Sequence, residues 1–101
     1  MPVPSNPKQL TRSARAAFWQ AVKDCLVEFH RQSLNKATSE VTRLRRELEE
    51  APNDIDRDAV YHSEPFYVAC DLSGISKPRD QDALLDVNRV KYKSMLEHLG
   101  W

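Results

Sequence analysis

Apolar residues recur every three or four positions from Ser13 to Glu50, a segment that holds neither glycine nor proline. This spacing is typical of an amphipathic helix. The first set is Phe18, Val22, Cys25, Leu26 and Phe29. The second set, which we call the 34–48 stripe, is Leu34, Ala37, Val41, Leu44 and Leu48.

The length of this segment raises a geometric problem. An unbroken helix of 38 residues would be about 57 Å long, whereas a globule of this size has a radius of gyration of about 13 Å. Either the helix breaks near 33–38, where Asn35 and Thr38 could cap a second helix, or it protrudes and needs another chain to cover it. No clear second capping signature interrupts the pattern, so we expect one long helix covered by a partner.

Two glycines indicate where later helices end. Gly74 and Gly100 each follow a helical pattern and precede one apolar residue, Ile75 or Trp101. Helices often end in a left-handed turn that glycine adopts at little cost, and the next residue then packs back onto the last turn. We therefore expect Ile75 to pack onto Cys70 and Trp101 onto Leu96.

The remaining segments complete an all-α fold: a small helical bundle or helical hairpin with a long N-terminal helix, a short helical connector and a C-terminal helix packed back. Residues 1–9 hold three prolines and are expected to form a flexible arm, with 10–101 as a single helical domain. In the connector, Asp54 could cap one short helix, and Ser63 or Glu64 a second that has Pro65 in its first turn. The last helix should start near Pro78 and bury Leu84, Leu85, Val87, Tyr92, Met95, Leu96 and Leu99.

Composition narrows the function classes. Fifteen basic residues balance fifteen acidic ones, so the chain lacks an overall field that attracts nucleic acid or an anionic membrane. No run of about 18 apolar residues exists to span a bilayer, and the start lacks the apolar segment of a secretory signal. We expect a cytoplasmic protein with no membrane partner, in which Cys25 and Cys70 are reduced, buried thiols.

Motifs for metal or covalent chemistry are incomplete. In "HSEP", His62 and Glu64 have the spacing of a zinc deaminase ligand and its acid/base, but the paired cysteines that would complete the shell are missing. In "DIDRD", the calcium-loop spacing fails at the required glycine and final glutamate. The three histidines and two cysteines, His30, His62, His98, Cys25 and Cys70, show no zinc-ligand spacing. We expect no catalytic residue, cofactor or metal.

Two alternatives stay open. A metal-dependent all-α hydrolase, similar to nucleotide pyrophosphohydrolases, would use paired helix carboxylates, for which Glu47 with Glu50 and Asp82 with Asp86 are the candidates. A weak nucleic-acid-binding regulator would use Arg43, Arg45 and Arg46, but the glutamates among them cancel much of the field that such binding needs, so nucleic acid is an unlikely partner.

Association with protein is the function that the pattern favours. A helix must bury its apolar face, and a chain of 101 residues has little material to cover a helix so long. We therefore expect a non-catalytic interaction protein, either a homodimer or a subunit or adaptor of a larger complex. The expected interface is the 34–48 stripe, unless the chain itself covers it.

Overall fold

The computed structural model describes residues 12–50 and 60–100, and within them every regular element is helical. The prediction of an all-α bundle is therefore confirmed. The elements are α1 (Arg12–His30), α2 (Leu34–Glu49), the short 3-10 helix η2 (Val60–His62), α4 (Pro65–Leu72) and α5 (Pro78–Leu99).

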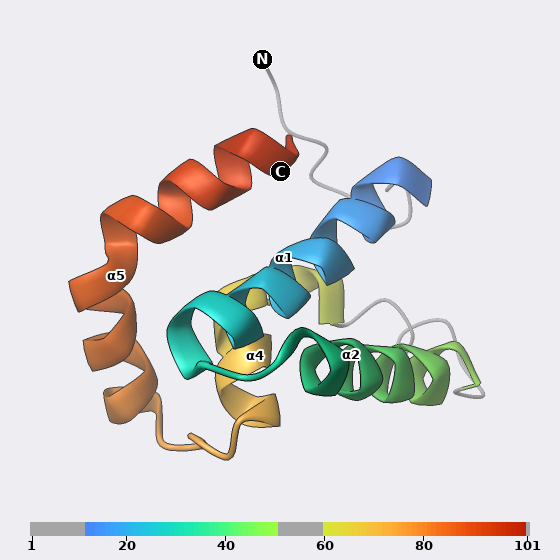
Figure 1. The fold of residues 1–101 in the computed structure, drawn as a ribbon, viewed down its shortest axis with the longest axis horizontal. Helices are drawn as coiled ribbons and strands as arrows, with labels where there is room; N and C mark the ends of the chain where they lie inside the picture. The colour runs from blue at the N-terminus through green and yellow to red at the C-terminus, as the bar shows by residue number, and fades with distance from the viewer. Residues whose placement is uncertain (1–11, 51–59, 101) are drawn as a thin grey trace.

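Helix α1 is the centre of the bundle. It packs against α2, α4 and α5, and α4 also contacts α5. Figure 1 shows α2 turning back across α1, while α5 curves round the other side of the molecule. The radius of gyration is 13.4 Å and the longest dimension is 33 Å.

The prediction of one long N-terminal helix is wrong, because the helix is interrupted between His30 and Leu34. Arg31 adopts a left-handed conformation with φ of 56°, which ends α1. The hydroxyl of Ser33 then accepts a hydrogen bond from the backbone N–H of Lys36 at 3.1 Å and so caps α2. The break lies at the early edge of the predicted range, and its cap is Ser33 rather than Asn35 or Thr38.

Because α2 folds back, the chain covers most of the 34–48 stripe itself. Ala37 is completely buried and Val41 is 8% exposed, so neither is free to contact a partner. Leu44 and Leu48 are half-buried against the same core. Leu34, at the first position of α2, is 62% exposed.

Glycine ends α4 as predicted. Gly74 has φ of 88°, its N–H donates to the carbonyl of Asp71, and the N–H of Ile75 donates to the carbonyl of Cys70 at 2.9 Å. These two bonds form a Schellman motif, and the Ile75 side chain packs against the core. Gly100 ends α5 in the same left-handed conformation, with φ of 76°.

Aromatic rings fill the core between α1, α4 and α5. Phe66, at the start of α4, is fully buried. Its ring centroid lies 5.4 Å from that of Phe29 on α1 and 5.3 Å from that of Tyr92 on α5. Aromatic pairs at such distances stabilise a core beyond the area they bury.

The buried face of α5 differs from the predicted one at one residue. Val87 was expected to line that face, but its side chain is 79% exposed.

Some predictions concern parts of the chain outside the described residues. These are the flexible arm at 1–9, the helix expected after Asp54 and the packing of Trp101. They stay predictions.

Candidate functional site

The "HSEP" segment is a helix start held by a tyrosine. Glu64 precedes α4, but its carboxylate does not cap that helix. Instead, the hydroxyl of Tyr92 donates to Oε2 of Glu64 at 2.7 Å and accepts from the backbone N–H of Phe66 at 3.3 Å. Burial, together with this bond to Glu64, raises the pKa of Tyr92 above its ordinary value. The hydroxyl is therefore held protonated, in a structural role that joins α4 to α5.

Neither thiol has the surroundings of a nucleophile. Cys25 is fully buried, with its sulfur 4.0 Å from the sulfur of Met95, and burial raises the pKa of its thiol well above the ordinary range. Burial also raises the pKa of Cys70 to about 11. Since the thiolate is the reactive form, both side chains serve as small core residues.

The candidate metal ligands do not gather in the part of the chain that the structure describes. There, no group of three or more His, Cys, Asp or Glu side chains could hold a metal ion. His62 and His98 are exposed, whereas His30 is half-buried beside the Phe66 ring.

The paired carboxylates of the hydrolase alternative lie at the C-terminal end of α2 and on α5, two helices at opposite sides of the bundle in Figure 1. Three of the four bind neighbouring side chains. Glu47 pairs with Arg43 at 3.3 Å, Asp82 accepts from the Tyr67 hydroxyl at 2.7 Å, and Asp86 pairs with Arg89 at 2.8 Å. The arrangement does not bring the two pairs to one site.

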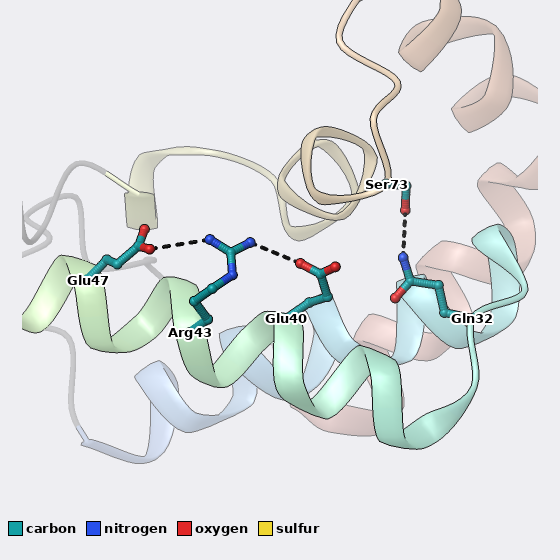
Figure 2. Close-up of polar contacts among 5 residues, drawn as sticks. All are labelled: Gln32, Glu40, Arg43, Glu47 and Ser73. Atoms are coloured by element: carbon teal, nitrogen blue, oxygen red, sulfur yellow. Dashed lines mark hydrogen bonds and ion pairs between the residues drawn. The ribbon is translucent and has the colours of Figure 1, made fainter.

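The arginines of the nucleic-acid alternative are largely neutralised within α2. Figure 2 shows the Arg43 guanidinium between Glu40 and Glu47, at 3.0 and 3.3 Å. Arg45 pairs with Glu49 at 3.1 Å. Such pairs on an exposed helix face reduce the positive field that phosphate binding requires.

The feature that sequence reasoning missed is an exposed apolar surface on α5. Val87 is 79% exposed and Val90 is 86% exposed. With the exposed residues Ala83 and Ser94 they recur at spacings of four, three and four, and we call these four residues the α5 outer face. Because an α-helix has 3.6 residues per turn, this face lies opposite the side on which Leu85 and Tyr92 are buried. The spacing itself was the signal that could have identified it.

A groove of about 960 Å³ runs beside this face, between α1 and α5. Asp24 and Glu28 line it from α1, and Val87 and Val90 from α5. Lys91 bridges the two helices, because its Nζ lies 3.0 Å from Oε2 of Glu28. The groove therefore combines apolar and charged lining.

No family model, curated protein or solved structure matches this chain. Among the described helices, none is long and apolar enough to cross a membrane.

Proposed function

We propose that this chain is a small, non-catalytic helical interaction protein of the cytoplasm, which acts as a homodimer or as a subunit of a larger complex. Its contact surface in this proposal is the α5 outer face. The observation that carries the proposal is the exposure of Val87 and Val90 in the middle of α5.

Two physical arguments support a contact there. Water makes exposed apolar area unfavourable, and burying one valine against a partner is worth about 1.5–3 kcal/mol. Valine also forms helices less readily than alanine, because its β-branch restricts the side chain. Neither Val87 nor Val90 therefore benefits the isolated helix, whereas both would benefit a complex.

The 34–48 stripe supports the proposal less well than α5 does. Its central residues, Ala37 and Val41, already pack within the chain. Leu34 remains exposed, and its contact with a partner stays a prediction. The α5 outer face thus replaces the stripe as the main surface.

Site-specific photo-crosslinking in cells that express the protein tests the proposal. A photoreactive amino acid is placed at Val87, at Val90, or at Ser39 as a control, because Ser39 is an exposed position on α2. We expect a covalent adduct with a protein at Val87 and Val90 but not at Ser39. Adducts at the valine positions no more abundant than at Ser39 would overturn the proposal.

A further inference from the structure

The charges in the central part of α5, residues 80–93, fall into two blocks of opposite sign. Residues 80–86 contain three aspartates and no basic residue, and residues 87–93 contain three basic residues and no acidic one. All six side chains belong to exposed residues. They are Asp80, Asp82 and Asp86 in the first block, and Arg89, Lys91 and Lys93 in the second.

We propose that the partner of the α5 outer face is a second copy of this chain, bound with its α5 antiparallel to the first. This inference rests on the proposed function and specifies its partner. An antiparallel pair places the acidic block of each copy beside the basic block of the other, and a two-fold axis repeats this match. A parallel pair would place like charges beside each other.

The α5 outer face fixes how the two helices would align. With the axis near residues 88–89, Val87 faces Val90 of the second copy, and the reverse contact follows from the symmetry. Ala83 then faces Ser94 in the same way. This is the pattern by which apolar residues spaced three and four apart meet in a pair of antiparallel helices.

The same alignment pairs charges beside the valines. Asp86 and Lys93 are seven residues apart, or about two helical turns, so they flank the same side of the α5 outer face. In the antiparallel pair, Asp86 lies beside Lys93 of the second copy, and this contact occurs twice. Within one chain Asp86 pairs with Arg89, but both side chains are more than 60% exposed. Exposed pairs of this kind hold their partners weakly, so Asp86 is free to turn to Lys93.

The proposed dimer interface covers only the central part of α5. The alignment brings Asp80 towards Glu97 of the second copy, and two carboxylates repel each other, so we limit the interface to residues 83–94. Interfaces smaller than about 1,200 Å² in total belong to weak complexes. We therefore expect a reversible dimer that weakens as salt screens the charge pairs.

Sedimentation equilibrium of the purified chain, up to about millimolar concentration because the interface is small, tests the proposal. We expect the wild type to dimerise and the double variant Val87→Lys, Val90→Lys to be monomeric. The matched control is Thr38→Lys, Thr42→Lys, which adds the same charge at two exposed β-branched residues on α2. It should dimerise as the wild type does. Circular dichroism checks that each variant keeps its helices.

A charge exchange tests the orientation. Asp86→Lys sets two basic residues against each other at both symmetric contacts and should weaken the dimer about tenfold or more. Adding Lys93→Asp restores opposite charges and should restore most of the affinity. In a parallel pair these two positions do not meet, so the second substitution would give no recovery. Absence of recovery overturns the antiparallel arrangement.

The failures of the two proposals are distinguishable. A wild type that stays monomeric throughout the concentration range overturns the homodimer, as does a dimer that the valine substitutions leave intact. If crosslinking at Val87 and Val90 then captures a different protein, the proposed function stands and only the second copy is excluded. If it captures nothing, both proposals fail.

Discussion

The hydroxyl of Tyr92 lies 2.7 Å from the carboxylate of Glu64, a residue 28 positions earlier in the chain. The same oxygen accepts a hydrogen bond from the backbone N–H of Phe66, one of the donors left free at the start of α4. Tyr92 thus satisfies both an acceptor and a donor at the α4 terminus from a different helix. This contact fixes where α5 crosses α4.

Replacing Tyr92 with Phe should destabilise the fold by about 1–3 kcal/mol, because it leaves the buried N–H of Phe66 without an acceptor. The matched control is Tyr67→Phe, which removes an exposed hydroxyl that donates to Asp82. Its effect should stay within about 0.5 kcal/mol. Urea denaturation of both variants measures the difference. Equal losses would show that the Tyr92 hydroxyl has no special role in stability.

Arg31→Gly should stabilise the protein by up to about 1 kcal/mol, because a side chain at positive φ costs about 1–2 kcal/mol and glycine costs less there. The sign of the effect is diagnostic. In a continuous helix, the same substitution would destabilise by about 1 kcal/mol. Gly74→Ala is the converse control: its φ is 88° and no atom lies within 4 Å of the added methyl. The expected loss therefore comes from the backbone alone. Thermal unfolding measures both.

Local signals in the sequence were enough to place several helix ends. Gly74 and Gly100 end helices, and Pro65 and Pro78 begin them, because each residue restricts or frees the backbone by itself. The break at Arg31 had no such signal. Its left-handed conformation is unfavourable for arginine, and the packing of α2 against α1 compensates for it, a tertiary effect that periodicity does not report.

The candidate surface on α5 was missed for a different reason, because here the sequence did carry the signal. Val87 lies close in sequence to Leu84 and Leu85, so a count of apolar residues assigns it to their side of the helix. At 100° per residue, however, it points about 200° away from Leu85. The bond from Tyr92 to Glu64 joins separate helices and could not be predicted from spacing within either one.

Acid should destabilise the protein through His30. Burial lowers the pKa of this side chain below its ordinary value of 6.5, so the folded chain favours the neutral ring. Below about pH 6.5, His30 binds a proton more readily in the unfolded chain than in the folded chain. The free energy of unfolding therefore falls as the pH falls. Urea denaturation at about pH 7.5 and about pH 5.5 measures the loss.

His30→Gln should remove part of this acid sensitivity, because glutamine does not titrate in that range. The control is His98→Gln, which changes an exposed histidine near the end of α5 and should leave the sensitivity unchanged. If His30→Gln and the wild type lose the same stability between the two pH values, His30 is not the cause.

Millimolar Mg²⁺ should leave the melting temperature unchanged. The hydrolase alternative needs both carboxylate pairs at one site, but Glu47 lies on α2 and Asp82 and Asp86 lie on α5, at opposite sides of the bundle (Figure 1). A ligand that binds only the folded state stabilises it by RT ln(1 + L/Kd), where L is the free ligand concentration, so a thermal shift with added Mg²⁺ detects such a site. A rise that Asp82→Asn abolishes would favour the hydrolase.

Replacing both Val87 and Val90 with Ala should stabilise the monomer while weakening the dimer. Alanine forms helices better than valine by about 0.5 kcal/mol at each position, and the exposed valines give up little packing. Truncating a buried side chain has the opposite effect: Leu26→Ala, at a fully buried position, should cost about 2–5 kcal/mol.

Concentration separates these two effects on the valines. Association stabilises the folded state more as the protein becomes more concentrated, so the melting temperature of the wild type should rise with concentration. The alanine variant should melt higher than the wild type in dilute solution and show a smaller rise. A variant that melts lower when dilute would mean that the monomer itself needs the two valines, and the α5 outer face would then belong to its core.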